Sequence, residues 1–291
     1  MSIAEPTSVA LNNGLMMPKL AFAANVWPAP VCRNATSLAL DAGFRFMWSS
    51  FLIGAACQRA QRTAIDEHPS ITRAGIFLAG TVDTQSCASK AACYSATLAG
   101  ATDQFSFLGP EPLDMLMLDY PSSGGCDGIA GQWQAFTELY RAKKVKSIAV
   151  SNFGGDQLAC LFPSGAATTV VPPVANQLSF YVGHTAIDLA LNARHGIVVQ
   201  AYSPLDSGSL ASDPLLEKVG KAHSKTAAQV ALRYIVQKNV TIATQSTKAT
   251  HLSEDLAVFG WTLTPAEMVK LDAHRTMRGD ETSILRGDEY T

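Results

Sequence analysis

Polar side chains stand where apolar runs of this sequence end, and one of them is a carboxylic acid. Asp119 follows the apolar run 115–118, while Ser151, Gln177 and Tyr202 end or follow later runs of the same kind. A carboxyl group held at the end of a buried strand can have a raised pKa and can act as a general acid or base. Asp119 is therefore the candidate for proton transfer; the alternative is a solvated or helix-capping aspartate without a catalytic role.

The elements that must position these side chains are eight apolar runs of strand length, at 19–23, 44–48, 76–80, 115–118, 147–150, 174–177, 197–201 and 241–244. They follow a hairpin-like turn at 12–14 and alternate with segments of helical period, such as 129–143, 155–162, 184–194 and 226–237. Eight strands that alternate with helices predict an α/β fold in which eight parallel units close a (β/α)8 TIM barrel. We expect one domain over residues 1–291, with a short N-terminal hairpin and a short C-terminal tail.

A barrel of this kind brings the carboxyl ends of its strands to one mouth, where the active sites of such barrels lie. We therefore expect one set of side chains, each at or after the end of a strand, to surround that mouth: Trp48, Thr81, Asp119, Ser151, Gln177, Tyr202 and Ser246. Asp119 would then lie near Trp48, Tyr120 and Asn152 rather than in open solvent.

Charged side chains are few. The 22 Lys and Arg and 24 Asp and Glu residues make up 16% of the chain and leave a net charge of −2, against about 25% charged residues in an average soluble chain. This balance argues against nucleic-acid binding, and no run approaches the roughly 18 apolar residues of a membrane-spanning helix. No targeting peptide is visible, so we expect a soluble protein of an intracellular compartment, either the cytoplasm or an organelle.

The cysteines and histidines lack the spacing of a metal site. Six cysteines, at 32, 57, 87, 93, 126 and 160, contain no Cys-x-x-Cys pair, and six histidines form neither His-x-His nor His-x-x-x-His. Such spacings are typical of zinc and redox sites. We therefore expect no metal, and we interpret the cysteines as small buried residues.

The chain resembles the aldo-keto reductases in seven phrases that have the order and spacing of that family: LNNGLMMPKLAF, LALDAGFRFMWSS, LDMLMLDYP, KKVKSIAVSNF, PPVANQLSFY, VVQAYSPLDSGSL and KTAAQVALRYIVQKNV. The resemblance extends from about residue 9 to about residue 275, and VSNF, NQ and AYSPL fall at the ends of the fifth, sixth and seventh expected strands. It implies an (α/β)8 barrel that binds NADPH in an extended groove at the C-terminal face and reduces carbonyls to alcohols.

The four side chains that perform this chemistry in the family are absent from the matching positions. The resemblance implies a tyrosine whose acidity is tuned by a lysine, an aspartate and a histidine. The matching residues here, in the order aspartate, tyrosine, lysine and histidine, are Trp48, Ile53, Thr81 and Asp119. Because such groups act as a unit, loss of all four predicts loss of that mechanism. A local misalignment would instead leave Tyr94 or Tyr120 as the proton donor.

The cofactor groove is retained at one end and altered at the other. The resemblance assigns Ser151, Asn152 and Gln177 to the nicotinamide amide and Tyr202 to the ring that stacks beneath it. Gln245 and His251 replace the cations that read the 2′-phosphate. The candidate cofactor-binding residues, in a groove that could be vestigial, are Ser151, Asn152, Gln177, Tyr202, Ser203, Leu205 and Ser246. We expect no cofactor, or weak NAD(P)H binding that prefers NADH; alternatively, these side chains only satisfy backbone groups at strand ends.

Three functions remain open. The absent tetrad favours a catalytically degenerate, non-enzymatic binding or structural subunit of a larger assembly. The first alternative is a barrel enzyme with changed, non-redox chemistry of the isomerase, cyclase or dehydratase type that uses Asp119. The second alternative is a residual NAD(P)H-dependent carbonyl reductase.

Two charge-poor segments, 88–108 and 154–202, predict contact with another protein. The first contains only Lys90 and Asp103 as charged residues, and the second only Asp156, Asp188 and Arg194. Protein interfaces are depleted in charge at their core. The expected contributors from the first segment are Ala96, Ala99, Phe105 and Phe107. Peripheral association with a membrane complex is compatible with this surface, and the charged tail 279–291 is expected to face solvent.

Overall fold

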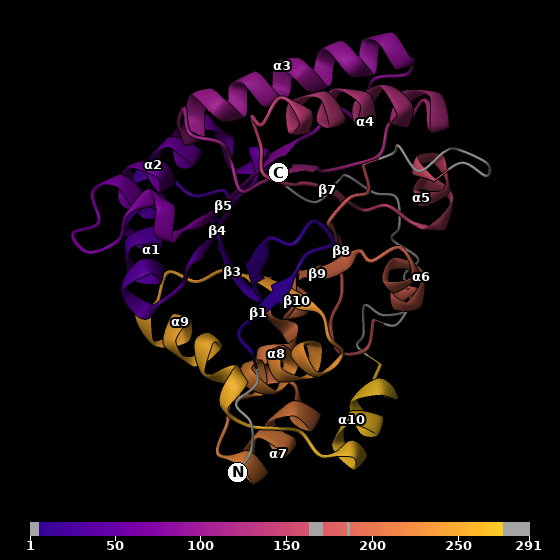
Figure 1. Cartoon of the computed structure of the whole chain (residues 1–291). Coiled ribbons are helices and arrows are strands. Elements are labelled where there is room, and N and C mark those ends of the chain that lie inside the picture. Colours follow the sequence, from indigo (N-terminus) through magenta and orange to yellow (C-terminus); the bar gives the residue numbers. More distant parts are fainter. Residues whose placement is uncertain (1–5, 163–170, 185–186, 276–291) are drawn as a thin grey trace.

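Eight parallel strands close a barrel in the computed structural model, which describes residues 6–162, 171–184 and 187–275 (Figure 1). The order around the barrel is β10-β3-β4-β5-β6-β7-β8-β9. The strands are β3 (Leu20–Ala23), β4 (Phe46–Ser49), β5 (Phe77–Val82), β6 (Met115–Leu118), β7 (Ile148–Ser151), β8 (Ala175–Ser179), β9 (Val198–Tyr202) and β10 (Thr241–Thr244). The predicted barrel is thus confirmed, with all eight expected strands present and only small shifts at their ends.

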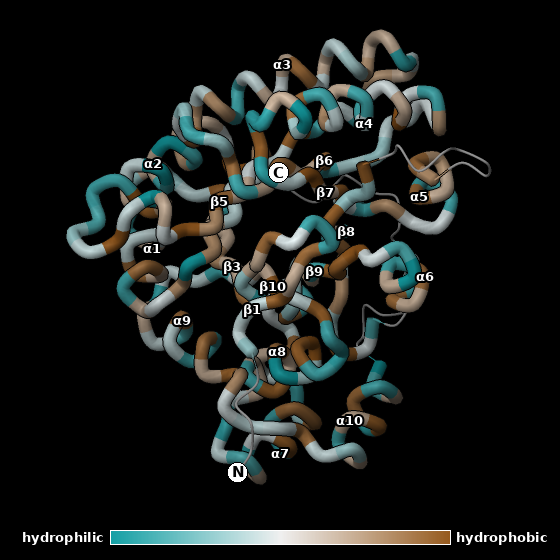
Figure 2. The backbone as a smooth tube through the Cα atoms, viewed as in Figure 1, coloured by the Kyte–Doolittle hydropathy of each residue, from teal (hydrophilic) through white to brown (hydrophobic). Residues whose placement is uncertain are grey.

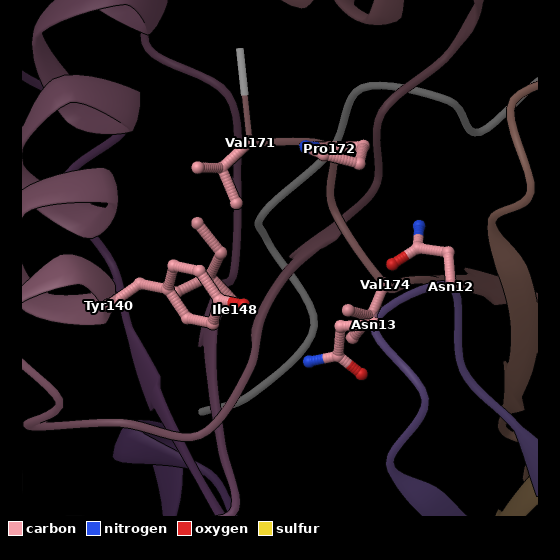
Figure 3. A pocket seen from close by; sticks show the side chains of 7 residues that line it. All are labelled: Asn12, Asn13, Tyr140, Ile148, Val171, Pro172 and Val174. Atoms are coloured by element: carbon pink, nitrogen blue, oxygen red, sulfur yellow. The ribbon is translucent and has the colours of Figure 1, made fainter. Parts of the chain in front are cut away.

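The predicted hairpin is also confirmed and lies at the amino-terminal end of the barrel. Strands β1 (Ser8–Ala10) and β2 (Met16–Pro18) pair antiparallel, and Leu11 and Met17 join the cluster inside the barrel. Asn12 Nδ2 donates to Pro173 O at 2.9 Å, and Asn13 Nδ2 donates to Lys146 O at 3.1 Å. A cavity of about 290 Å³ lies between this turn, Tyr140 and the chain around Val174 (Figure 3).

Helices surround the barrel and begin at its mouth, since each main helix follows a strand. They are α1 (Ala29–Ala42), α2 (Gly54–Asp66), α3 (Lys90–Leu108), α4 (Gly125–Arg141), α5 (Gly155–Leu161), α6 (Leu189–Arg194), α7 (Pro214–His223), α8 (Ala227–Gln237), α9 (Ala249–Leu256) and α10 (Pro265–Asp272), with the short 3-10 helices η1 (Phe51–Ile53), η2 (Arg73–Gly75), η3 (Asp206–Ser212) and η4 (Ala257–Gly260). The helix predicted at 184–194 is shorter, because the Asp188 carboxylate caps it by accepting from Leu191 N at 2.8 Å.

Side chains inside the barrel follow the two-residue period of the strands. Alternate residues form one buried cluster: Ala21, Phe46, Trp48, Phe77, Ala79, Met115, Met117, Ala149 and Ala175. The strands are mostly apolar, whereas the outer helices mix polar and apolar residues (Figure 2). Because successive side chains point to opposite faces, the next positions in this alternation are Thr81, Asp119, Ser151 and Gln177. The interior is therefore apolar at its centre and polar at the mouth.

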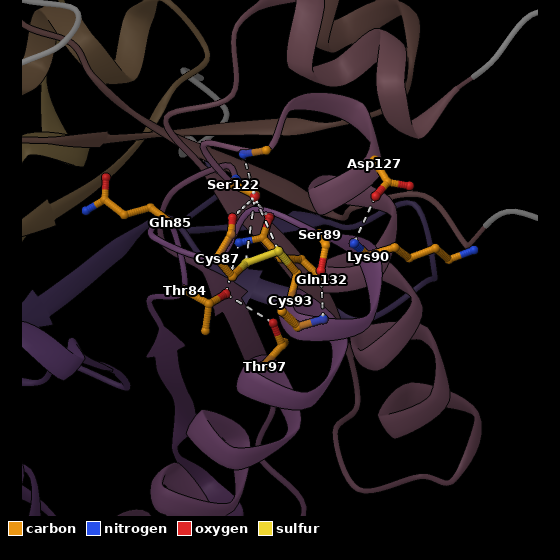
Figure 4. The surroundings of a disulfide bond; sticks show 12 residues. Thr84, Gln85, Cys87, Ser89, Lys90, Cys93, Thr97, Ser122, Asp127 and Gln132 are labelled. Atoms are coloured by element: carbon orange, nitrogen blue, oxygen red, sulfur yellow. Dashed lines mark hydrogen bonds between the residues drawn. A yellow bond between two sulfur atoms is a disulfide. The ribbon is translucent and has the colours of Figure 1, made fainter.

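All six cysteines are paired in disulfides, which their interpretation as small buried residues did not include; Cys32, Cys57 and Cys93 are buried, and the other three are not. The disulfides are Cys32–Cys57, Cys87–Cys93 and Cys126–Cys160, with Cα atoms 5.5, 5.1 and 5.0 Å apart. Cys32 and Cys57 lie in the first turns of α1 and α2, whereas Cys126 is at the start of α4 and Cys160 is near the end of α5. Figure 4 shows the second pair beside Ser122, whose hydroxyl donates to Cys87 O.

The charge-poor helix α3 lies along α4 (Figure 1). Phe105 and Phe107 are partly buried against the core, and the guanidinium carbon of Arg59 lies 4.4 Å from the Phe107 ring centroid. Ala99 is exposed and Ala96 half-buried. Contact of this face with another protein stays a prediction, and the tail 279–291 lies outside the described residues. No helix in the described ranges combines the length and hydrophobicity that a bilayer crossing requires.

Candidate active site

Four polar side chains lie side by side near the carboxyl ends of neighbouring strands: Asp119, Ser151, Gln177 and Gln200. Leu118 pairs with Val150, so Asp119 is level with Ser151; Ser151 pairs with Gln177, and Gln177 with Gln200. All four polar residues are buried, and Gln177 Nε2 donates to Gln200 Oε1 at 2.7 Å. Sequence reasoning missed Gln200, although the alternation in β9 places it one step inward of Tyr202.

Asn152 forms hydrogen bonds with residues at the ends of three strands, β6, β7 and β9. Its Nδ2 donates to the backbone oxygen of Asp119 and to Ser151 Oγ, both at 3.1 Å, and the Tyr202 hydroxyl donates to Asn152 Oδ1 at 3.1 Å. Its φ of 61° is left-handed, a conformation that asparagine tolerates better than most residues. The structure thus brings Ser151, Asn152 and Tyr202 into one hydrogen-bonded cluster, as the sequence predicted for the mouth.

The carboxyl group of Asp119 is held by two hydroxyl groups. Thr81 Oγ1 donates to Asp119 Oδ2 at 3.4 Å, and the Ser151 hydroxyl forms a second bond. Burial raises the pKa of Asp119 to about 7 by disfavouring the charged form; the nearby charge of Asp83 acts in the same direction, and the two hydroxyl bonds oppose both. This side chain can therefore exist in either protonation state near neutral pH.

The other residues that the sequence analysis matched to the family tetrad border the same region. Phe51 N, at the start of η1, donates to Thr81 Oγ1 at 2.9 Å, which fixes the segment that carries Ile53. Ile53 is buried with Ala24 and the Cys32–Cys57 disulfide. Trp48 is 8% exposed, and its Nε1 is a buried donor without a partner among the described residues.

Tyr94, one of the two tyrosines left open as donors, lies away from the barrel interior. It is on α3, and its hydroxyl donates to Glu138 Oε2 of α4 at 2.7 Å, in the outer ring of helices. Tyr120 directly follows Asp119, and its backbone oxygen accepts from Gln132 Nε2 at 3.3 Å. Within the described ranges, His, Cys, Asp and Glu form no group of three that could hold a metal ion.

The remaining candidate cofactor residues lie in the segments that follow β9 and β10. Ser203 and Leu205 are half-buried and lead from β9 into η3. Ser246 is half-buried before α9; its Oγ accepts from Lys248 N at 3.1 Å and lies 3.5 Å from His251 Nδ1. Gln245 is exposed, as are Lys248 and His251. The first turn of α9 contains no acidic residue.

Comparisons with known proteins identify the family. A model described as "Aldo/keto reductase family" matches residues 101–276. A 9,11-endoperoxide prostaglandin H2 reductase of Trypanosoma cruzi is 28% identical over 97% of both chains. The crystal structure of an aldo-keto reductase from a deep-sea metagenome library is 26% identical, with a TM-score of 0.81 over 92% of this chain and 94% of that one. A mutant of Gox0644 in complex with NADPH is 25% identical, with a TM-score of 0.81 over 96% and 97%.

These findings correct the functional predictions made from the sequence. The expected non-enzymatic subunit is wrong, as is the enzyme with non-redox chemistry, because the relatives are named as reductases and one structural neighbour binds NADPH. The expectation of no cofactor is not supported either. The match of Trp48, Ile53, Thr81 and Asp119 to the family's catalytic positions was made from the sequence alone, and it does not exclude an acid at the same mouth. Matched by the family model over more than half of its length, the chain belongs to the aldo/keto reductase family.

Proposed function

We propose that this protein is an NAD(P)H-dependent carbonyl reductase whose site is the mouth of the barrel. The observation that carries the proposal is the hydrogen-bonded cluster of Ser151, Asn152 and Tyr202, with Gln177 level with Ser151 on the next strand. The family resemblance assigns these same positions to the nicotinamide. A cluster of amides and hydroxyls at strand ends suits an uncharged amide group, which both donates and accepts hydrogen bonds.

The buried groups at the mouth fit such a ligand. Gln200 Nε2 and Trp48 Nε1 are buried donors that lack a partner in the described part of the chain, and an acceptor oxygen would satisfy a donor of this kind. Ser151, Asn152 and Gln177 would hold the amide, and Tyr202 would pack against the ring. Ser203, Leu205 and Ser246 would line the rest of the groove. When bound, the nicotinamide supplies a hydride to the carbonyl carbon.

The phosphate end of the groove favours NADH over NADPH. Gln245 and His251 stand where the family has cations, and Lys248 is the one lysine or arginine in 245–251. A hydrogen bond to a charged group contributes about 1.5–3 kcal/mol, so loss of two weakens NADPH binding by roughly two to four orders of magnitude. Lys248 offsets part of this loss.

Nucleotide binding and turnover test the proposal. We expect the disulfide-intact protein to oxidise NADH, and NADPH more weakly, in the presence of aromatic aldehydes and diketones, followed by absorbance. Asn152→Ala should weaken nucleotide binding at least about tenfold in calorimetric titration, because it removes three hydrogen bonds of the cluster.

Asn12→Ala is the matched control, since Asn12 makes one bond at the opposite end of the barrel. Its affinity for the nucleotide should equal that of the wild type. The proposal fails if neither nucleotide binds and no carbonyl in the panel is reduced.

A further inference from the structure

Carbonyl reduction at this mouth needs an acid, and the position where the family has its tyrosine holds Ile53. Asp119 and Tyr202 are side chains near the mouth that can give up a proton. The Tyr202 hydroxyl already donates to Asn152 Oδ1, in the cluster assigned to the nicotinamide. Asp119 lies beside that cluster, level with Ser151 and joined through its backbone oxygen to Asn152.

Building on the proposed reductase function, we propose that Asp119 is its catalytic acid and gives its proton to the carbonyl oxygen of the substrate. The chemical balance is simple. The hydride from the nicotinamide forms the new C–H bond, and the carbonyl π bond breaks. The O–H bond of Asp119 breaks as the O–H bond of the alcohol forms. The carboxylate that remains takes a proton from water before the next turnover, while the nicotinamide leaves oxidised.

The contacts of Asp119 suit a group that changes its protonation state. Thr81 Oγ1 and the Ser151 hydroxyl are its side-chain partners, and a hydroxyl can donate to a carboxylate or accept from a carboxylic acid. Each hydroxyl is itself oriented, Thr81 by Phe51 N at 2.9 Å and Ser151 by Asn152 Nδ2 at 3.1 Å. Both forms of Asp119 are thus satisfied without movement of the backbone.

The charge around Asp119 keeps the acid form available. Asp83, at the end of β5, is the charged group that acts on it, and its negative charge opposes ionisation. Burial acts in the same direction and raises the pKa of Asp119 to about 7, so a large fraction is protonated near neutral pH. Thr81 acts in the opposite direction as a positioning residue, because its hydrogen bond stabilises the carboxylate.

Asp119→Asn provides the main test, because it keeps the size of the side chain and removes the proton. We expect kcat for carbonyl reduction to fall about 100-fold or more, while the calorimetric affinity for NADH changes little. Protonated Asp119 and Asp255 should both contribute to the infrared carbonyl absorption that titrates near neutral pH in the wild type, and Asp119→Asn should lose the Asp119 contribution while Asp255→Asn keeps it. Asp255→Asn is the matched control. Asp255 is a second buried carboxyl group; it lies on α9 and accepts a hydrogen bond from Thr244 Oγ1 at 3.0 Å. Its replacement should leave kcat unchanged at saturating NADH.

The pH profile separates a proton donor from a structural side chain. Reduction needs the acid form, so kcat should fall above the pKa of Asp119, and oxidation of the alcohol should rise with pH in the same range. Asp83→Asn should move this midpoint to lower pH because it removes the opposing charge. Thr81→Val should move it to higher pH because it removes the bond that stabilises the carboxylate.

The outcomes distinguish the two proposals. If the wild type neither binds a nicotinamide nor reduces any carbonyl, the reductase function fails, and the role of Asp119 fails with it. If the wild type is active and Asp119→Asn keeps most of its kcat, only the role of Asp119 is overturned. Loss of activity in Tyr202→Phe or Tyr120→Phe would then identify the acid. Should Asp119→Asn fail to fold, the Asp83→Asn profile decides, and an unmoved midpoint overturns the proposal.

Discussion

Asp119 and Asp255 are two buried carboxyl groups without a cation as their main partner. Each is held by threonine, Thr81 in one case and Thr244 in the other, and burial raises the pKa of each to about 7. In the unfolded chain such groups ionise near pH 4. The folded state therefore holds these two protons more tightly than the unfolded state does, which links the stability of the protein to pH.

The sign of this linkage gives a prediction at the scale of the residue. Between about pH 4 and pH 7 these two carboxyl groups bind more protons in the folded protein than in the unfolded chain, so their contribution to the free energy of unfolding falls as pH rises. Asp255→Asn should flatten this fall, by on the order of a few kcal/mol between about pH 5 and pH 8 in urea unfolding. The exposed substitution Asp103→Asn serves as the control and should leave the slope unchanged; an equal slope in all three proteins would contradict the role of burial.

Glycines allow α3 to pack closely on α4 and on the barrel. A Cβ atom at Gly131 would lie 2.1 Å from Lys90 O, and one at Gly124 would lie 2.2 Å from Ala88 O. On the other side of α3, a Cβ at Gly100 would lie 2.6 Å from a Val82 methyl carbon. These glycines let the two helices and the barrel approach closely, so small residues there have a function inside the chain.

Gly131→Ala tests this close approach between elements. The added methyl group meets the backbone of α3, which cannot move aside as a flexible side chain could, so we expect a loss of roughly 1–3 kcal/mol in urea unfolding. Gly75→Ala is the control, since a Cβ there meets nothing within 4 Å. If both variants unfold at the same urea concentration, the helices are packed less closely than the structure shows.

The three disulfides act on the molecule as a whole, because two of them join neighbouring helices. Cys32–Cys57 links α1 to α2, and Cys126–Cys160 links α4 to α5. Cys87–Cys93 closes the loop before α3. Disulfides persist mainly in oxidising compartments.

Removal of single pairs should have effects that follow the length of the closed loop. The pairs enclose sequence separations of 25, 6 and 34 residues, and a longer loop restricts the unfolded chain more. The double variant Cys32→Ala/Cys57→Ala should lose about 2–4 kcal/mol of unfolding free energy, and Cys87→Ala/Cys93→Ala should lose less. Thermal melting measures the loss of stability in each double variant. The wild type melted with reductant is the comparison, and an unchanged melting temperature there would show that the pairs do not form.

The sequence by itself determined that the chain forms a barrel and which residues stand at the strand ends that form its mouth. The strands alternate with helices in a local pattern, and that pattern predicts parallel units without knowledge of any distant contact. It also placed Asp119, Ser151 and Tyr202 at strand ends, and the family phrases agreed with it. The prediction of a non-enzymatic subunit is wrong because it relied on four matched positions, such as Ile53, whereas the family match and the relatives named as reductases point to an enzyme.

Only the tertiary structure decided the cysteine pairs and the state of Asp119. Cys126 and Cys160 are 34 residues apart in the chain, and nothing in their spacing shows that the start of α4 lies beside the end of α5. The register of β6 and β7 places Asp119 beside Ser151, and closure of the barrel buries it. Pairing and pKa depend on which distant groups share a small volume from which water is excluded, and that volume exists only once all eight strands have closed the barrel.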